Sequence, residues 1–292
     1  MSYVSVFLQG GLGNQLFMIF TTIAYSIKHS RKIIFTYDEV LRSGIERFTY
    51  WHSFLNRLEP YTTEKSIINN QDIYKFKQNY REHNFHFDDI PEVDRGSNLL
   101  LHGYFQSYKY FENYKEEIFE LIDLRVIQDV IINKFSHYLS SEENIKIISM
   151  HFRIGDYITK QQYHPVIPYH YYNNAIIELK KNNISEGKIL YFCENADNVT
   201  VNSHIEHLKL SHTSFEFIKV DDTIEDWEQM LIMSCCDVNI IANSTFSWFG
   251  AYLNFNIREH LVFYPSVWFG PSLQSHNLKD MFLPDWIKVD TN

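Results

Sequence analysis

The order of apolar segments near the N-terminus limits the fold more than any other feature of this sequence. Val4–Leu8 is a short β-rich run that ends at two glycines, and Leu12–Ser30 then carries apolar residues at helical spacing. Lys32–Tyr37 is typical of a second strand. A strand, a glycine turn, a helix and another strand form a βαβ unit, in which the two strands pair in parallel. We therefore predict an α/β protein.

The second half of the chain repeats this alternation. Strands are predicted at Ile147–Phe152, Lys188–Cys193, Val238–Ala242 and Leu261–Tyr264, and helices at Tyr169–Asn182, Asp226–Cys236 and Phe246–Asn254. The first half adds a strand at Leu99–Phe105 and a helical pattern over Ile118–Leu139, whereas residues 38–98 show no clear period. A chain of 292 residues suits two domains, and the polar segment at 140–146 is the best boundary. We predict domains 1–143 and 144–292.

Composition and charge exclude several classes of protein. The formal charge of −10 makes non-specific binding to nucleic acid unfavourable, so an anionic ligand would need a local cluster of donors. Three cysteines form no disulfide framework and favour a reducing compartment. The first residues lack the pattern of a signal peptide, and no apolar run approaches the roughly 20 residues of a membrane helix. We expect a cytoplasmic protein without a transmembrane segment.

Three polar segments follow predicted strands, where ligands bind in open α/β sheets. The first contains Gly10, Gly11, Gly13, Asn14 and Gln15. Its amides suit an anion or a sugar hydroxyl, although a tight strand-to-helix turn explains the glycines equally well. The spacing matches neither a dinucleotide fingerprint nor a P-loop.

The second and third segments carry the best groups for a phosphate. Strand alternation puts His151 and Arg153 on one side and Phe152 on the other, and an arginine fork there suits a pyrophosphate. A structural bridge from Arg153 to Asp156 is the alternative. The third segment includes Asn243, Ser244, Thr245 and Phe246 at a predicted helix start, where hydroxyl residues are usually caps but also hold phosphates.

Other common site patterns are missing from the sequence. It contains no Asp-x-Asp, His-x-x-x-His or Cys-x-x-Cys, so a metal site is not expected. The Gly-x-Ser-x-Gly elbow of serine hydrolases is also missing.

Taken together, the segments resemble the inverting α-1,2-fucosyltransferases of the bacterial and blood-group-H type, assigned to glycosyltransferase family 11. The resemblance rests on Gly10–Phe17, on Gly103–Ser107, on His151–Tyr157 at six of seven positions, on Ile240–Ala251 except at Phe249, and on Pro168 with Tyr171 and Tyr172. These matches extend over nearly the whole chain.

The resemblance implies a GT-B fold with two Rossmann-like domains that face each other across a cleft. GDP-L-fucose would bind mainly to the C-terminal domain, and a galactose-containing glycan mainly to the N-terminal one. Fucose would pass with inversion, without a metal or other cofactor, to a hydroxyl that is usually O2 of galactose. Arg153 would stabilise the leaving GDP, Asn14 would lie near the sugar and the acceptor, His151 would approach the guanine or ribose, and the third segment would hold the phosphates.

Two departures affect the expected donor site. The second arginine of the family motif is Ile154 here, and the family's Trp-Glu-Asp-Met is Trp227–Met230, with Gln229 in place of the aspartate. Glu194, Asn195, Asp226 and Gln229 are the candidate guanine contacts. Neither the acceptor nor a general base is identified. The alternatives are a transferase for another GDP-sugar or another hydroxyl, and a non-catalytic module that binds a nucleotide or a glycan.

Overall fold

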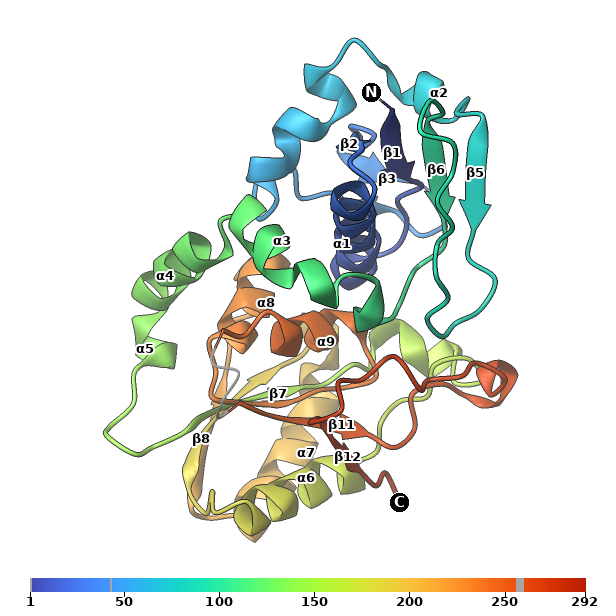
Figure 1. Ribbon diagram of the computed structural model, residues 1–292. Helices are drawn as coiled ribbons and strands as arrows, with labels where there is room; N and C mark the ends of the chain where they lie inside the picture. Colours follow the sequence, from blue (N-terminus) through green and yellow to red (C-terminus); the bar gives the residue numbers. More distant parts are fainter. Residues whose placement is uncertain (1, 43, 256–259) are drawn as a thin grey trace. The chain divides into compact units, whose positions relative to one another are not determined.

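The computed structural model describes residues 2–42, 44–255 and 260–292 (Figure 1). Its contacts divide the chain into two units. The first contains the chain up to Ile127 together with His276–Leu283, and the second contains Gln128–Ser275 and Pro284–Asn292. The predicted boundary at residue 143 differs from this division. Two segments account for the difference, the helices before residue 143 and the return of the chain at His276.

The helical pattern predicted over Ile118–Leu139 is divided into three helices. These are α3 (Lys115–Leu121), α4 (Leu124–Lys134) and α5 (Ser136–Leu139). Asp123 adopts a left-handed conformation with φ of 53° between α3 and α4, which interrupts the helix. The Gln128 side chain then donates to the Ser234 hydroxyl at 2.7 Å and to the Leu253 carbonyl at 3.0 Å. These buried bonds attach α4 to the second unit.

The first unit contains a four-stranded parallel sheet with the order β2-β1-β6-β5. Its strands are β1 (Tyr3–Val6), β2 (Lys32–Ile33), β5 (Gln78–Arg81) and β6 (Leu99–His102). Helix α1 (Leu12–Lys28) follows β1 and is buried along most of its length, because apolar side chains fill nearly every turn. The predicted βαβ unit is confirmed, although the strand predicted at Lys32–Tyr37 pairs regularly only over its first two residues.

The region that showed no clear period, 38–98, forms short elements. They are the antiparallel pair β3 (Val40–Leu41) and β4 (Arg47–Phe48), the single-turn helix α2 (Asn70–Ile73), strand β5, and the 3₁₀ helices η1 (Asn56–Tyr61) and η2 (Thr63–Lys65). Two further 3₁₀ helices, η3 (Tyr108–Tyr110) and η4 (Glu112–Tyr114), precede α3. Elements of two to six residues are too short to show a hydrophobic period in the sequence.

The second unit contains a six-stranded parallel sheet with the order β12-β11-β10-β7-β8-β9. Its strands are β7 (Ile147–His151), β8 (Gly187–Phe192), β9 (Phe215–Lys219), β10 (Val238–Ile240), β11 (Leu261–Pro265) and β12 (Ile287–Val289). Its helices are α6 (Tyr169–Lys181), α7 (Asn198–Ser211), α8 (Asp226–Ser234) and α9 (Thr245–Tyr252), and its 3₁₀ helices are η5 (Gly155–Thr159), η6 (Asn195–Asp197) and η7 (Pro271–Leu273). Every strand and helix predicted here is present, while α7, β9 and β12 were not predicted.

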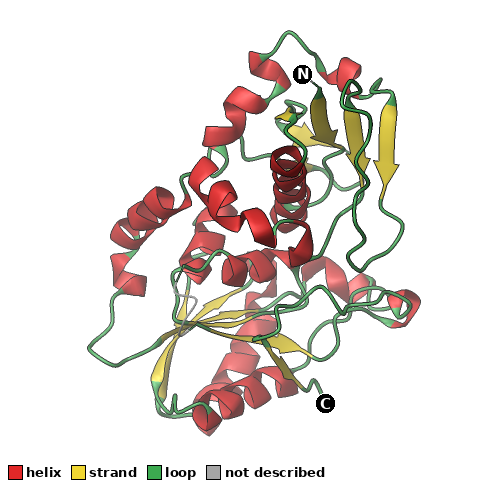
Figure 2. Cartoon of the chain, viewed as in Figure 1, coloured by secondary structure: helices red, strands yellow, loops and turns green. Residues whose placement is uncertain are grey.

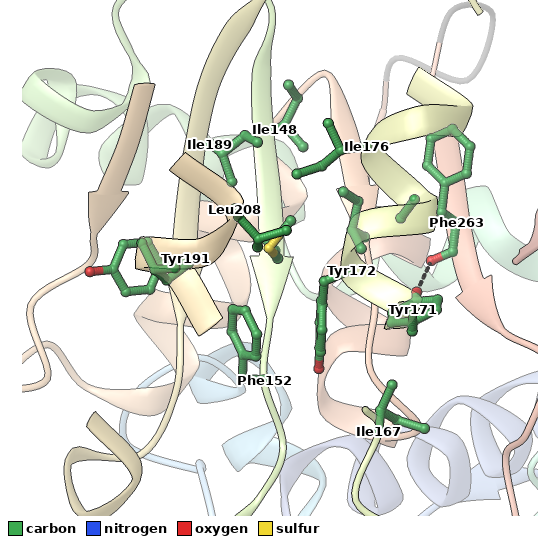
Figure 3. Close-up of a cluster of buried hydrophobic side chains, with 14 of the residues drawn as sticks. Ile148, Phe152, Ile167, Tyr171, Tyr172, Ile176, Ile189, Tyr191, Leu208 and Phe263 are labelled. Carbon is green, nitrogen blue, oxygen red and sulfur yellow. Dashed lines mark hydrogen bonds between the residues drawn. The ribbon is translucent and has the colours of Figure 1, made fainter. Parts of the chain in front are cut away.

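Helices cover both faces of this second sheet, with α6 and α7 on one face and α8 and α9 on the other (Figure 2). The core on the α6 side is formed by alternate residues of β7 and β8 and by the buried faces of both helices (Figure 3). Phe152 stacks on Tyr172 with ring centroids 4.1 Å apart. The buried Tyr171 hydroxyl lies 2.6 Å from the Ile241 carbonyl and 3.0 Å from the Phe263 carbonyl. These contacts fix the carboxyl ends of the central strands.

The strand order reverses once in each sheet. In the first unit, β2 lies on one side of β1 and β6 on the other, so the order reverses between β1 and β6. In the second unit, β8 lies on one side of β7 and β10 on the other, so the order reverses between β7 and β10. The loops that leave the two central strands on opposite sides of such a point open a crevice at the carboxyl edge, and ligands bind there in open parallel sheets. The topology therefore marks two edges, one in each unit, as candidate sites.

Candidate functional site

The loops that carry the second and third predicted segments are neighbours in the second unit. They follow β7 and β10, which pair directly with Ile148 opposite Val238 and Met150 opposite Ile240. The loop after β8 lies on the other side of β7, where His151 pairs with Phe192. Residues predicted from separate motifs are therefore brought to one sheet edge by parallel pairing.

The Arg153 side chain bonds two carboxylates at this edge. Its guanidinium donates to Asp156 and to Glu194, and it lies over the Tyr157 ring at 5.2 Å from the centroid. The structural bridge to Asp156 is therefore present, and Glu194 adds a second carboxylate. The arginine is held as an oriented cation whose charge is balanced within the chain.

Asp156 is itself shared between two cations. Burial opposes its ionisation, but the hydrogen bond from Lys160 and the charge of Arg153 hold the pKa of its carboxyl below the ordinary value. The Lys160 ammonium lies 2.9 Å from the Asp156 carboxylate. Asp156 therefore stays ionised at neutral pH and orients Arg153 from one side.

Gly155 lets the second carboxylate approach. Its φ is 21°, and a Cβ at this position would lie 2.8 Å from Glu194 Oε2. The Gly155 amide donates to the Asp197 carboxylate at 2.9 Å, which fixes the turn. A glycine here is explained by both the backbone conformation and the close approach of Glu194.

His151 lies at the end of β7 and is buried next to Phe246 on α9, with ring centroids 5.5 Å apart. Burial, and then the charges of Arg153 and Lys219, lower the pKa of the imidazole to about 3. The ring is therefore neutral at physiological pH. Its Nδ1 is buried and has no hydrogen-bond partner among the described residues, so it is suited to bond a neutral ligand group.

The third segment begins α9 and acts as a helix cap. The Ser244 hydroxyl accepts from the Phe246 amide at 3.3 Å, so the capping alternative is present in the structure. The Asn243 side chain donates to the carbonyls of Pro165 at 2.8 Å and Trp268 at 3.2 Å, while its own Oδ1 is buried without a partner in the described part of the chain. The Tyr157 hydroxyl donates to the Asn243 carbonyl at 3.2 Å and joins the two segments.

The candidate guanine contacts are divided between two places. Glu194 binds Arg153, and Asn195 accepts from Asn198 at 3.0 Å in the same loop. Asp226 and Gln229 lie in the first turn of α8. The side-chain amide of Gln229 donates to the Ile224 carbonyl at 2.8 Å, and the Asp226 carboxylate accepts from the Trp227 backbone amide at 2.7 Å. Their role toward a base stays a prediction.

The N-terminal segment forms a tight turn into α1 in the first unit. Gly10 has a φ of 75°, and a Cβ there would lie 2.7 Å from Asn14 Nδ2. Gly11 is the helix cap residue, and Gly13 lies buried within α1. The Gln15 amide donates to the carbonyls of Gly10 at 3.0 Å and Phe48 at 2.9 Å, so this side chain has a structural role.

Asn14 is joined to another predicted motif. Its Oδ1 accepts from the Gln106 amide at 2.8 Å, and Gln106 belongs to the segment Gly103–Ser107. The loops after β1 and β6 therefore meet at the carboxyl edge of the first sheet, as parallel pairing of these strands requires.

Several residues at these edges were not predicted from the sequence. Tyr157 belongs to the motif His151–Tyr157, but nothing in its sequence context indicated its contacts with Arg153 and Asn243. Lys160 and Asp197 support Asp156 and Gly155 from positions outside any motif. Glu82, in the region without a clear period, contacts the loop after β6. Such partners become neighbours only in the folded chain, because they are distant in sequence or lack a pattern.

Within residues 2–42, 44–255 and 260–292, no group of three or more His, Cys, Asp or Glu side chains is arranged to hold a metal ion. No helix in this described part of the chain is long and apolar enough to cross a membrane.

The chain is similar to several known proteins. The model of the family described as glycosyl transferase family 11 matches residues 4–290. The chain is 27% identical to the O-antigen biosynthesis glycosyltransferase WbnK of Escherichia coli, over 97% of this chain and 99% of that protein. It is 24% identical to an alpha-1,2-colitosyltransferase of Escherichia coli, over 99% of this chain and all of that protein.

Among solved structures, a glycosyl transferase family 9 protein from Veillonella parvula resembles the fold with a TM-score of 0.52. The sequence identity is 12%, and the match covers all of this chain and 87% of that one. The family match makes this protein a glycosyltransferase, and its fold is α/β of the GT-B type, built on parallel sheets. The chain belongs to glycosyl transferase family 11, so the resemblance found in the sequence is confirmed.

Proposed function

We propose that this glycosyltransferase moves L-fucose from GDP-L-fucose to a galactose hydroxyl, O2, with inversion. The observation that carries the proposal is the convergence of Arg153, His151 and the start of α9 at one strand edge. In a protein with a formal charge of −10, an oriented arginine beside a helix N-terminus is a local site for an anion. The family membership supports a sugar transfer reaction.

The mechanism follows from where charge develops. The acceptor oxygen forms a bond to the anomeric carbon of fucose as the bond from that carbon to the diphosphate oxygen breaks. The electron pair of the broken bond leaves with GDP, and the proton of the acceptor hydroxyl passes to water. Arg153 would bind the diphosphate through the fork that now bonds Asp156 and Glu194, and this attraction grows as the leaving group gains charge. The N-terminus of α9 adds a positive dipole end.

His151 would contribute as a neutral group. Because the pKa of its imidazole is lowered to about 3, it adds no charge to the site at physiological pH. A neutral imidazole still offers one donor and one acceptor for a ribose hydroxyl or a guanine edge. In this mechanism Arg153 recognises the negative charge of the diphosphate, and His151 contributes to the recognition of the nucleoside.

We also propose that no metal ion takes part, since Arg153 supplies the positive charge that a metal would bring to the diphosphate. Turnover should therefore persist in excess EDTA. Loss of activity on chelation, restored by Mg²⁺ or Mn²⁺, would overturn this part of the proposal.

A second donor is favoured by one observation, the similarity to a protein named an alpha-1,2-colitosyltransferase. Colitose differs from L-fucose in lacking the 3-hydroxyl group. A GDP-linked deoxy sugar of this kind would use the same diphosphate contacts, so the nucleotide site described above does not distinguish the two donors.

The test is incubation of the protein with GDP-fucose, GDP-colitose or GDP-mannose and a panel of β-galactosides, followed by NMR location of the new linkage. We expect fucose on O2 of galactose in the α configuration. Preferential transfer of colitose would establish the second candidate. Binding of GDP without transfer or hydrolysis of any donor would instead identify a non-catalytic module.

A further inference from the structure

The first sheet has a cavity at its own carboxyl edge. Its volume is about 430 Å³, within the roughly 300–1,000 Å³ typical of ligand pockets. The lining residues follow or end three neighbouring strands, β1, β5 and β6, and they are Phe7, Gln9, Arg81, Glu82, His102 and Gly103. Since β1 and β6 flank the point where this sheet changes direction, the cavity lies where ligands bind in such folds.

Glu82 is held in a fixed position on the wall of this cavity. Its Oε2 accepts from the backbone amides of Tyr104 at 2.8 Å and Phe105 at 3.0 Å. Its own amide donates to the His102 carbonyl at 2.7 Å, which continues the ladder between β5 and β6. A carboxylate bonded in this way is pre-organised, because both its backbone and its side chain are fixed before any ligand arrives.

The chain after β6 is shaped to receive this carboxylate. Gly103 has a φ of 156°, and a Cβ there would lie 2.4 Å from Glu82 Cβ, so only glycine fits. The fully buried Phe105 adopts a left-handed conformation with φ of 53°, which is unfavourable for a bulky residue. Strained backbone of this kind persists where the surrounding structure over-determines it, and it is concentrated at binding sites.

The second carboxylate oxygen of Glu82 remains available. Both of its hydrogen bonds end on Oε2, and no ion pair among the described residues includes Glu82. Desolvation raises the pKa of this carboxyl to about 6, so it is largely ionised at neutral pH despite its burial. An ionised oxygen without a partner in a pocket favours a ligand that donates a hydrogen bond.

The remaining walls combine flat apolar surface with polar groups. The Phe7 ring stacks on His102 with centroids 5.9 Å apart and an interplanar angle of 23°, and Tyr74 lies 6.0 Å from Phe7. Gln9 and Arg81 add an amide and a guanidinium. One positive and one negative side chain among the lining residues leave the walls without net charge, which suits a neutral ligand. A pyranose offers both an apolar C–H face for the rings and hydroxyls for the polar groups.

We propose that this cavity binds the acceptor sugar and that Glu82 accepts a hydrogen bond from one of its hydroxyls. The identification of that sugar as the acceptor rests on the proposed function. The binding of a neutral pyranose by these residues rests on the cavity alone.

The test measures sugar binding without turnover, by saturation-transfer NMR with methyl glycosides of galactose, glucose and N-acetylglucosamine at millimolar concentration. The variants are Glu82→Gln and Phe7→Leu, with Glu117→Gln on the exposed face of α3 as the matched control. The side chain introduced by Glu82→Gln retains an oxygen that can accept the Tyr104 and Phe105 amides, so the fold should survive. GDP affinity measured by calorimetry serves as the second control.

We expect a methyl glycoside to bind the wild type and the Glu117→Gln control, and its affinity to fall at least tenfold in Glu82→Gln. Absence of binding by all three glycosides, or unchanged binding in both cavity variants, would overturn the proposal. Sugar binding that depends on Glu82 in a protein that transfers and hydrolyses no GDP-sugar would support the cavity and refute the proposed function. Transfer with an acceptor KM that is unchanged in Glu82→Gln would support the proposed function and refute the role of the cavity.

Discussion

The carboxyl edges of the two sheets share the same topology but differ in the partners of their charged side chains. In the second unit, Arg153 is paired with Asp156 and Glu194. In the first unit, Glu82 lies on a cavity with no ion-pair partner in the described part of the chain. Two carboxylates of the chain hold the Arg153 cation in place, whereas backbone amides alone hold the Glu82 carboxylate. Under the two proposals above, the edge with Arg153 suits a diphosphate and the edge with Glu82 suits a neutral sugar.

The largest effect is expected at Arg153. Lysine keeps the charge but loses the planar fork, so both Arg153→Lys and Arg153→Ala should lower kcat by about 10²-fold or more, with a smaller change in donor KM. Steady-state kinetics with GDP-fucose measures both constants. The exposed Arg42→Lys, in the first unit, serves as a matched control.

A purely structural Arg153 would behave in another way. Arg153→Lys would then keep nearly wild-type kcat, and Arg153→Ala would mainly lower the melting temperature. Such a result would leave the second edge without its proposed anion site and would end the contrast between the two edges.

The next effect is a dependence of stability on pH at Glu82. Its pKa is raised from 4.5 to about 6, so the folded state binds the proton more tightly than the unfolded state. The resulting stabilisation is complete below pH 4.5 and is lost as the pH rises through 6, with a total of up to about 2 kcal/mol. Wild type should therefore lose stability relative to Glu82→Gln mainly between about pH 4.5 and 6.5.

Denaturant unfolding of both proteins over this pH range measures the difference. Arg81 and His102 line the same cavity, and the charge of Glu82 acts on Tyr80 and Tyr110. Because the Glu82→Gln variant retains these four residues, subtracting its stability curve from that of the wild type gives the contribution of the Glu82 carboxyl. A difference that does not vary with pH would show that Glu82 is not held as a desolvated carboxylate.

The helix cap gives a smaller effect. Ser244→Ala should destabilise the protein by about 1 kcal/mol, whereas Ser244→Gly should cost only a few tenths, because glycine is tolerated at an N-cap. A fall in GDP affinity in the glycine variant would then report a contact of the hydroxyl with the donor. Thermal unfolding and calorimetry separate the two roles, and equal losses of stability in both variants would contradict the capping assignment.

The smallest effect concerns Glu194, whose side chain is 53% exposed. If this carboxylate competes with the diphosphate for Arg153, Glu194→Gln should tighten GDP binding by a few-fold at low ionic strength. Weaker binding of GDP with unchanged binding of ADP would instead favour Glu194 as a contact to guanine.

The sequence predicted the second unit better than the first, for a physical reason. Strands such as Ile147–Phe152 and helices such as Tyr169–Asn182 are long enough to show their periods, and the motif at His151–Tyr157 lies directly at a strand end. The region 38–98 contains elements of only a few residues, so β5 was not predicted and Glu82 had no strand end to mark it. The pairing of Arg153 with Glu194 also required coordinates, because 41 residues separate them.

The most direct test of the separation between the two edges is the rate of GDP-fucose hydrolysis without acceptor, measured beside the rate of transfer to a galactoside. Glu82→Gln is expected to hydrolyse the donor like wild type but to need at least ten times more acceptor for half-maximal transfer. Arg153→Lys should lose hydrolysis and transfer together, each by about 10²-fold. Hydrolysis that falls in Glu82→Gln as far as transfer does, or that persists in Arg153→Lys, would contradict the account.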